Sequence, residues 1–278
     1  MLHYRPYPSF LQIPSTIQIT NQKIALCIIA THTYKNLINP LIQSINKHLF
    51  KKQQLTIYIY TDATTNQFET LNIPTTIIPT PHTPFPLPTL LRHSTLLTNP
   101  NLDQHDYIFH IDADVLFVGD IDHQMLGTGL TAIEHPSAAF SNIPQHFHHS
   151  TYETNPQSTA YIHPQQRHTY YCGAIQGGTT SSYIQAIETI TNNVKQDLGQ
   201  NIIARYHDES HWNKYLSQNP PSIKLPFWYC FPETSNPNNR VCDWNHQHVV
   251  PDGQQIKMLC LDKNLHGGYK TYRGNART

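Results

Sequence analysis

The sequence is poor in charge: Asp, Glu, Lys and Arg make up 13% of its 278 residues, and 18 basic residues balance 18 acidic ones. Without excess positive charge there is no broad surface for phosphate backbones, so we expect no nucleic-acid partner. Long apolar runs are also lacking. The longest, Ile24 to Ala30, falls far short of the roughly 20 residues that cross a bilayer, and residues 1–6 show no signal-peptide pattern. These absences predict a soluble, cytoplasmic protein without a membrane span.

Cysteine is scarce as well. No two cysteines have the C-x-x-C spacing of a zinc ribbon or a thioredoxin motif. Because cytoplasmic proteins keep their thiols reduced, we expect scattered free thiols rather than a structural zinc site. The five widely spaced cysteines are Cys27, Cys172, Cys230, Cys242 and Cys260.

The first third of the chain has the pattern of a strand, a helix and a second strand. Residues 23–30 form a short apolar run that suits a strand buried on both faces. Apolar residues then recur at helical spacing over 37–49, and residues 55–61 are β-branched and aromatic. Connections of this length predict a right-handed βαβ unit in a mainly parallel sheet.

The rest of the chain continues in the same style, without an internal repeat or a clean boundary. Six prolines between residues 74 and 88 exclude a helix or a central strand there and indicate a connector or a loop over a site. Further strands are expected at 107–111, 115–118, 130–134 and 256–261, and helices at 87–97, 183–198 and 209–216. We predict one α/β domain over 23–262, an extended lead-in over 1–22 and a basic tail over 263–278.

Two carboxylates one residue apart, Asp112 and Asp114, follow the strand predicted at 107–111. Ligands of open α/β sheets bind at the carboxyl ends of the strands, and residues i and i+2 of an extended segment point the same way. Two carboxylates can therefore hold a hard cation such as Mg²⁺ or Mn²⁺ against a phosphorylated ligand. A solvated acidic turn is the simpler interpretation. Both dehalogenase-like hydrolases and nucleotide-sugar glycosyltransferases use a D-x-D motif in this way.

A second acidic pair, Asp208 and Glu209, opens the helix predicted at 209–216. Acidic residues are common at a helix start because the helix dipole favours them. His207 and His211 could share a helix face and bind zinc, but the acid lies two residues after the first histidine, so the metalloprotease pattern is not met.

The surrounding residues resemble a known family. Residues 207–211 and 213–216 are similar to the H-D-E-S-H-x-N-K-Y-L signature of the blood-group A/B and α1,3-galactosyltransferase family, and residues 107–117, 156–162 and 170–178 match further motifs of that family in order. The resemblance implies a GT-A fold and a retaining glycosyltransferase, and it sets aside the dehalogenase alternative. Since no membrane anchor or stem is evident, we expect a soluble microbial or viral relative.

The resemblance also implies roles in binding a UDP-sugar donor. Tyr34 would stack on the uracil, Asp112 and Asp114 would hold Mn²⁺ or a similar divalent cation against the diphosphate, and Asp208 would bind the sugar hydroxyls. Ile29 and Ala30 could instead be strand core, and Arg92 a solvated helix residue. The implied donor-binding residues are Ile29, Ala30, Tyr34, Arg92, Asp112, Asp114, Cys172, Gly173, Ala174, Asp208 and Lys263.

Glu209 is the implied catalytic residue, either as a nucleophile or as a carboxylate that stabilises an oxocarbenium ion. The implied acceptor-binding residues are His135, Tyr206 and Trp212, although His135 could belong to a polar loop and Trp212 to the core. The predicted reaction moves galactose or N-acetylgalactosamine to a galactose-terminated oligosaccharide in α1,3 linkage, with retention. A UDP-sugar or glycan-binding module with weak catalysis is the alternative.

Two finer expectations concern the donor. Ala174 matches a position beneath the 2-substituent of the donor sugar, where a methyl group favours galactose over N-acetylgalactosamine. The segment 74–92 and the tail after Lys263 are expected to close over UDP and shield it from water.

Overall fold

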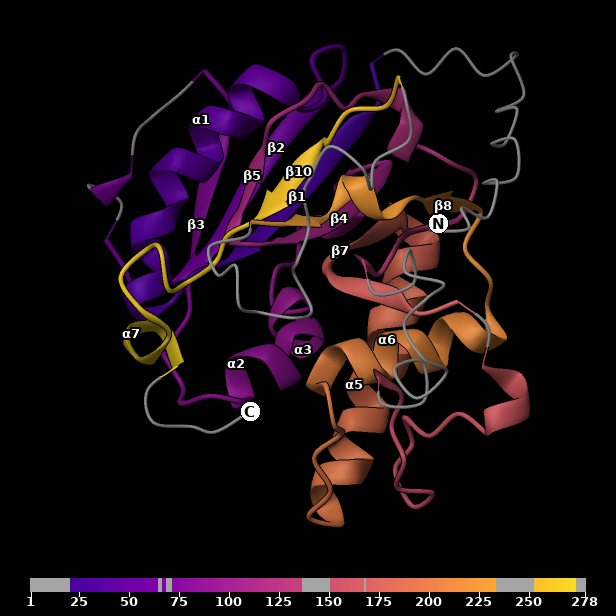
Figure 1. Ribbon diagram of the computed structural model, residues 1–278. Helices are drawn as coiled ribbons and strands as arrows, with labels where there is room; N and C mark the ends of the chain where they lie inside the picture. Colours follow the sequence, from indigo (N-terminus) through magenta and orange to yellow (C-terminus); the bar gives the residue numbers. More distant parts are fainter. Residues whose placement is uncertain are drawn as a thin grey trace, which may run out of the picture.

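The computed structural model describes residues 21–64, 67–68, 72–136, 151–167, 169–233 and 253–273. Within these residues a seven-stranded sheet has the order β3-β2-β1-β4-β7-β6-β8 (Figure 1). Its strands are β1 (Lys23–Ile29), β2 (Gln54–Thr61), β3 (Thr75–Pro79), β4 (Tyr107–Asp112), β6 (Leu130–Glu134), β7 (Tyr171–Thr179) and β8 (Ile223–Leu225). A smaller sheet joins β5 (Val115–Phe117), β10 (Met258–Cys260) and β9 (Phe231–Pro232).

The predicted α/β fold with a mainly parallel sheet is confirmed. Strands β1 and β2 are parallel neighbours with α1 (Ile38–His48) between them in the chain, as expected of a βαβ unit. Four of the six strand pairings in the large sheet are parallel, and the two antiparallel ones both involve β7. Among the described residues, no helix combines the length and apolar character that a bilayer crossing requires.

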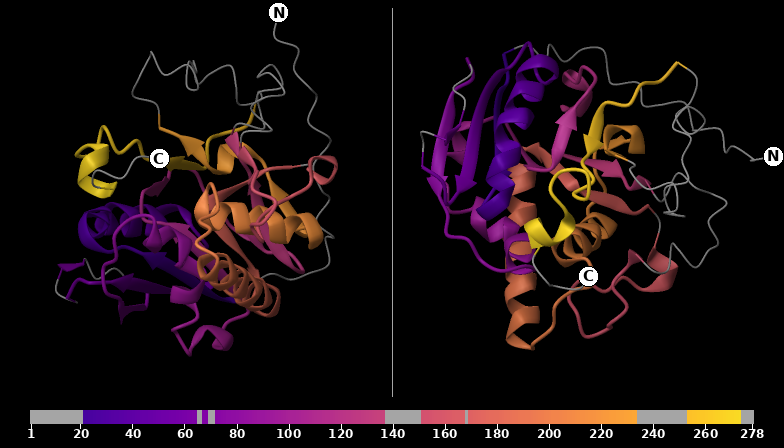
Figure 2. Two further views of the ribbon diagram at one scale, coloured as in Figure 1. Left: turned by 90° about the horizontal axis from the view of Figure 1, so that it is seen from below. Right: turned by 60° about the vertical axis from the view of Figure 1, so that its left-hand side comes forward.

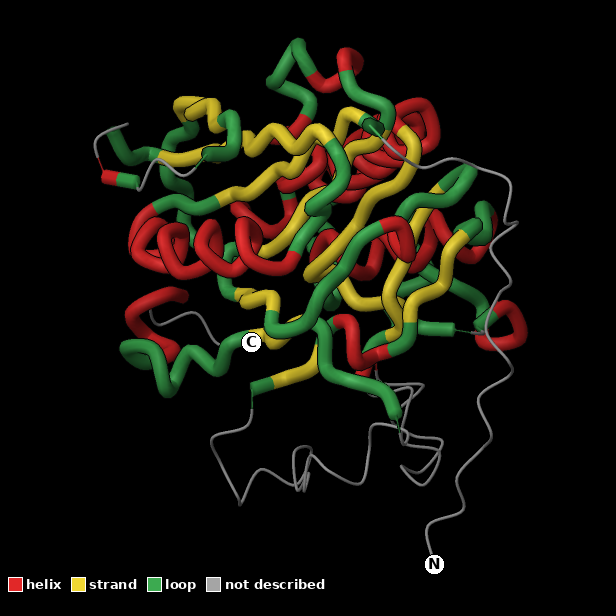
Figure 3. Tube along the Cα trace, turned by 90° about the horizontal axis from the view of Figure 1, so that it is seen from above, coloured by secondary structure: helices red, strands yellow, loops and turns green. Residues whose placement is uncertain are grey.

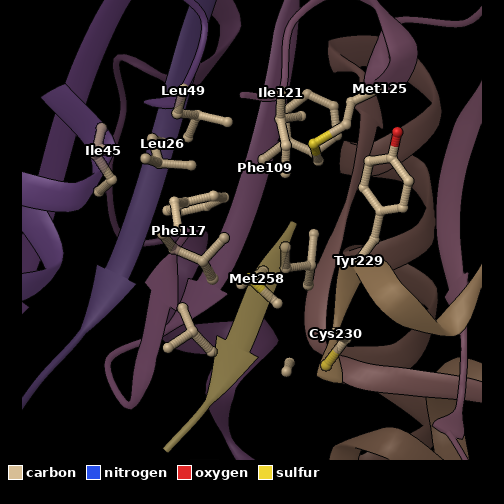
Figure 4. Packing of buried hydrophobic residues seen from close by; sticks show 14 of the residues in the cluster. Leu26, Ile45, Leu49, Phe109, Phe117, Ile121, Met125, Tyr229, Cys230 and Met258 are labelled. Atoms are coloured by element: carbon tan, nitrogen blue, oxygen red, sulfur yellow. The ribbon is translucent and has the colours of Figure 1, made fainter. Parts of the chain in front are cut away.

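Both faces of the large sheet are covered, because alternate residues of its central strands point to opposite sides. On β1, Ile24, Leu26 and Ile28 join a core beneath α1 and the small sheet, while Ala25 and Cys27 join a second core. Figure 3 shows α1 and the small sheet on one side of the large sheet, and Figure 4 shows the core between them. The second core lies beneath α3 (Arg92–Leu96), α5 (Thr180–Gly199) and α6 (His207–Gln218).

Strand β7 is the main element that the sequence did not predict. Its three glycines lower strand propensity, yet the packing requires at least one of them. A Cβ at Gly177 would lie 2.2 Å from Cδ1 of Phe109 on β4, so only glycine lets the two strands approach this closely.

The proline-rich segment forms β3 at the edge of the sheet, in agreement with the prediction that it is neither a helix nor a central strand. The helix expected over 87–97 is divided at Leu91 into α2 (Leu87–Leu90) and α3. The late strand over 256–261 is shorter than expected, spanning only β10. Residues 1–20 of the predicted lead-in and 274–278 of the predicted tail lie outside the described residues.

The four described cysteines are free thiols, as expected, but three of them lie together in space and are not scattered. Cys172 on β7, Cys230 before β9 and Cys260 on β10 meet, with Sγ–Sγ distances of 3.0 Å and 2.9 Å along the row. Hydrogen bonds to its two neighbours, together with burial, hold the pKa of Cys230 well above its usual range. The small sheet packs against β7 and thereby brings these distant thiols together. Cys242 lies outside the described residues.

Candidate active site

The carboxyl ends of the parallel strands form one edge of the sheet, and a pocket lies there. Ile29 and Asp112 are register partners at the ends of β1 and β4, so both reach this edge. Ile29, Tyr34, Arg92, Asp112 and Asp114 all line the pocket, which places five of the predicted donor-binding residues together.

Arg92 joins the two acidic motifs. Its Nη2 lies 2.7 Å from Oδ1 of Asp112, and its Nη1 lies 2.9 Å from Oδ2 of Asp208. Nη1 also donates to the carbonyl of Gly173 at 2.8 Å. The side chain is 7% exposed, so the alternative of a solvated helix arginine is wrong.

Burial sets the charge balance around Arg92. It raises the pKa of Asp112 to about 7 and that of Asp208 to about 6, although Arg92 acts to lower both. Burial also opposes the charge of Arg92 itself, but Asp112 and Asp208 raise its pKa above the usual value. Arg92 therefore favours the ionised form of both carboxylates and offsets part of the effect of burial on their pKa values.

The carboxylate of Glu209 is held by two donors. Tyr170 donates its hydroxyl to Oε1 at 2.8 Å, and the backbone N–H of Gly173 donates to Oε2 at 2.6 Å. A Cβ at Gly173 would lie 3.1 Å from both Cβ and Oε2 of Glu209, so glycine permits this close approach. Burial raises the pKa of Glu209, and the two hydrogen bonds counteract that effect.

Asn213, one turn after Glu209, fastens α6 to β7. Its side chain accepts the N–H of Tyr171 at 2.7 Å and donates to the Tyr171 carbonyl at 2.9 Å, as a neighbouring strand would. It also donates to the carbonyl of Glu209 at 2.9 Å. The H-D-E-S-H-x-N pattern thus contains the two acids, Asp208 and Glu209, and also the asparagine whose hydrogen bonds hold α6 against β7.

The segment after β10 returns to the pocket. Lys263 donates to Oδ2 of Asp114, and its Nζ lies 5.7 Å from the ring centroid of Tyr34. Tyr272 of α7 (Tyr269–Arg273) meets the Tyr34 ring edge-on at 5.1 Å and lines the pocket. Figure 2 shows α7 close to the segment that follows β1.

Not every predicted donor residue lines this pocket. The side chain of Ala30 is fully buried, because it continues the alternation that places Ile24, Leu26 and Ile28 in the core beneath α1. Cys172 and Ala174 are 6% and 9% exposed and face the core of the small sheet. Of the roles weighed for Ala30, strand core is therefore what the structure shows.

The three predicted acceptor residues have different surroundings. The ring of His135 meets Tyr170 edge-on at 5.7 Å, beside the hydroxyl that binds Glu209. Tyr206, at the start of α6, is 41% exposed. Trp212 is fully buried against Tyr183, so the prediction that it lines the acceptor site is wrong and its alternative, a core residue, is correct.

A family model describes much of the chain that carries this site. Glycosyltransferase family 6 matches residues 94–250, which is more than half of the 278 residues. The chain belongs to glycosyltransferase family 6. The resemblance found in the sequence motifs is thus confirmed, and the protein is a glycosyltransferase.

Similar curated proteins come from bacteria and mammals. The glycosyltransferase is 28% identical to the O-antigen biosynthesis glycosyltransferase WbnI of Escherichia coli over 77% of this chain and 90% of that protein. It is 25% identical to globoside alpha-1,3-N-acetylgalactosaminyltransferase 1 of Homo sapiens over 89% and 69%, respectively. It is also 25% identical to histo-blood group ABO system transferase 2 of Rattus norvegicus over 75% of this chain, but this match spans only 63% of the rat protein.

The D-x-D motif of the glycosyltransferase suits a divalent cation that shares its ligands with a donor. Asp112 and Asp114 line the pocket and supply the oxygen ligands that Mn²⁺ and Mg²⁺ prefer. In the described ranges, no group of three or more His, Cys, Asp and Glu side chains is arranged to hold a metal ion. Two carboxylates leave the remaining positions to phosphate oxygens and water, so the residues present fit such a cation.

Three residues of the glycosyltransferase site escaped prediction. Tyr170 stood in a matched motif without a role, yet it donates to Glu209. His93 and Gln176 are fully buried polar residues, and they contact each other at 2.6 Å. A lone polar residue in the glycine-rich segment 173–178 is a weak signal that could have marked Gln176, whereas His93 stands among polar neighbours and carries no such signal.

Proposed function

We propose that this glycosyltransferase moves galactose or N-acetylgalactosamine from a UDP-sugar to a galactose-terminated acceptor, forming an α1,3 link with retention. The observation that carries the proposal is the single network of Arg92, which joins the first D-x-D acid to Asp208 and, through Gly173, to Glu209. A donor lying across this network would have its diphosphate at the D-x-D motif and its sugar beside Asp208 and Glu209.

The UDP half of the donor would lie in the pocket at the carboxyl edge. Tyr34 offers an aromatic ring on which the uracil can stack. Tyr272 and Lys263, from the carboxyl-terminal segment, lie next to this ring and would border the bound uracil. Asp112 and Asp114 would hold Mn²⁺ or a similar cation, which supplies Lewis-acid stabilisation of the leaving diphosphate. Lys263, now paired with Asp114, can turn to the phosphates when that carboxylate is engaged.

The sugar half would lie against Asp208 and Glu209. Asp208 would accept hydrogen bonds from sugar hydroxyls, and Glu209 would face the anomeric carbon. The donors on its two oxygens, Tyr170 and Gly173, orient this carboxylate and act to lower its pKa against the effect of burial. It can then act as a nucleophile or stabilise an oxocarbenium ion while His135 and Tyr206 contact the acceptor.

A direct assay tests the proposal. The protein is incubated with Mn²⁺, lactose and either UDP-galactose or UDP-N-acetylgalactosamine, and both free UDP and the trisaccharide product are measured. We expect a product whose new bond is α1,3 by NMR. The absence of transfer and of donor hydrolysis with every galactoside tried would favour the binding module instead.

We expect activity to depend on a divalent cation. Two ionised carboxylates beside a diphosphate repel it, so EDTA should abolish transfer and added Mn²⁺ should restore it. The Asp112→Asn/Asp114→Asn double variant should remain inactive at any Mn²⁺ concentration. Full activity of wild type in excess EDTA, or an active double variant, would remove the cation from the mechanism.

Most of the Ala174 side chain packs in the core, but it remains 9% exposed, and its neighbour Gly173 binds the carboxylate of Glu209. We therefore expect its methyl group to border the sugar half of the donor, and Ala174→Gly to increase the use of UDP-N-acetylgalactosamine relative to UDP-galactose. A single methyl group alters such a choice by roughly 10–200-fold when it clashes with a substituent. The ratio of kcat/KM for the two donors measures the effect. If wild type already prefers UDP-N-acetylgalactosamine tenfold, the methyl group of Ala174 does not determine which donor sugar is used.

A further inference from the structure

Two buried polar side chains, His93 and Gln176, lie next to Arg92 in the interior of the protein. His93 follows Arg92 on α3, and Gln176 lies in the middle of β7; they are 1% and 0% exposed. The Nε2 atom of His93 lies 2.6 Å from Oε1 of Gln176. Nothing in the reaction proposed above uses either residue.

Gln176 donates to the same two oxygens as Arg92. Its Nε2 lies 3.1 Å from Oδ2 of Asp208 and 3.3 Å from the carbonyl oxygen of Gly173. The Nη1 atom of Arg92 reaches the same atoms at 2.9 Å and 2.8 Å. Arg92 and Gln176 therefore both donate to the Asp208 carboxylate and to the Gly173 carbonyl. The backbone N–H of Gly173 in turn donates to Glu209.

His93 determines which way the amide of Gln176 points. Burial lowers the pKa of His93 to about 3, so the ring is neutral at physiological pH. Because Oε1 of Gln176 can only accept, Nε2 of His93 carries the proton. The reversed amide would bring Oε1 against the Asp208 carboxylate and the Gly173 carbonyl, two acceptors, and would place two N–H groups opposite each other.

This arrangement has a cost for folding. Within the described part of the chain, Nδ1 of His93 is buried without a hydrogen-bond partner. A buried nitrogen without a hydrogen-bond partner destabilises the folded protein, and an apolar side chain would avoid that cost. Stability alone therefore does not account for the pair.

We propose that His93 and Gln176 are positioning residues that orient Asp208 towards the sugar half of the donor. The proposal rests on the function proposed above. Asp112 and Asp114, which are expected to hold the cation against the diphosphate, pair with Arg92 and Lys263, and the described contacts of His93 and Gln176 include neither carboxylate. Loss of the pair should therefore affect recognition of the sugar much more than recognition of UDP.

The test compares variants that differ in their ability to donate to Gln176. His93→Leu removes the donor, His93→Asn is polar but too short, and His93→Gln retains an N–H group at a similar reach. Gln176→Met removes the amide. His48→Leu is the matched control, because His48 lies at the end of α1 and pairs with Asp120, not with a residue of the site. Dissociation constants of UDP and UDP-galactose with Mn²⁺ are measured by calorimetry, and kcat and KM by transfer to lactose.

We expect His93→Leu, His93→Asn and Gln176→Met to weaken UDP-galactose binding about tenfold and to lower kcat about tenfold, with UDP binding within twofold of wild type. His93→Gln should recover most of both losses, and His48→Leu should match wild type. If His93→Leu does not fold, His93→Asn against His93→Gln gives the same comparison.

Four results would overturn the proposal. UDP and UDP-galactose affinities could fall together in step with melting temperature, which indicates a purely structural pair. His93→Gln could be no better than His93→Asn, or all variants could match wild type while wild type transfers galactose; in these cases the proposed function stands and the positioning role fails. A wild type that neither transfers nor hydrolyses any UDP-sugar would remove both proposals.

Discussion

Replacement of Glu209 by Gln should lower kcat for transfer by a factor on the order of 10³ or more while leaving the fold intact. The variant loses the negative charge that either mechanism requires at the anomeric carbon, whether it forms a bond there or only stabilises positive charge. Initial rates of transfer from UDP-galactose to lactose, measured at saturating donor, test this prediction.

The surroundings of Glu209 explain why the fold should survive. The amide oxygen of a glutamine can accept the N–H of Gly173, and its amide group can donate to the hydroxyl oxygen of Tyr170. The change also removes a carboxylate whose pKa is raised by burial, so the melting temperature should not fall. Tyr170→Phe is the companion variant: it keeps the charge, and we expect a much smaller loss of kcat. A Glu209→Gln enzyme with at least a tenth of wild-type kcat would exclude Glu209 from the chemistry.

The parts of the fold that could be predicted are those specified by local pattern. A few residues are enough to predict each of the first three elements: β1 is an apolar run, α1 has helical spacing, and β2 is β-branched. Their order along the chain then predicts that β1 and β2 are parallel neighbours. Strand β7 escaped because its glycines carry no strand signal. Glycine is required at position 177 because Phe109 of the neighbouring strand approaches it closely, and this contact can be seen only in the folded sheet.

The candidate site shows the same division. Asp112, Asp208 and Glu209 could be found because short motifs contain them, and the structure brings all three to Arg92 or to Gly173. The burial of a single side chain depends on elements distant in sequence, so local pattern could not decide it. Trp212 was a candidate for the acceptor site, but it is fully buried and packs against Tyr183 of α5. Conversely, Arg92 could have been a solvated helix residue, but β7 and α6 enclose it.

Replacement of Arg92 by Met should be the most destabilising change at the site. It leaves the buried Asp208 and the partly exposed Asp112 without the cation that pairs with both. Removal of one partner from a buried ion pair typically costs about 3–5 kcal/mol. Transfer should also be lost. Urea unfolding gives the free energy, with Arg167→Met as the matched control. The Arg167 guanidinium contacts the Ile162 carbonyl and the Tyr152 ring, so its loss should cost only about 1 kcal/mol.

The destabilisation by Arg92→Met should depend on pH in a defined direction. Burial already raises the pKa of Asp208 to about 6 in the native protein, and loss of Arg92 must raise it further. A carboxylate whose pKa is higher in the folded than in the unfolded state costs stability above its folded pKa, and protonation relieves that cost as pH falls. The difference from wild type should therefore be larger at pH 8 than at pH 5. The Arg92→Met/Asp208→Asn double variant should recover part of the stability at pH 8 without recovering activity. A destabilisation that is equal at both pH values would mean that lost packing, not the two unpaired carboxylates, accounts for the effect.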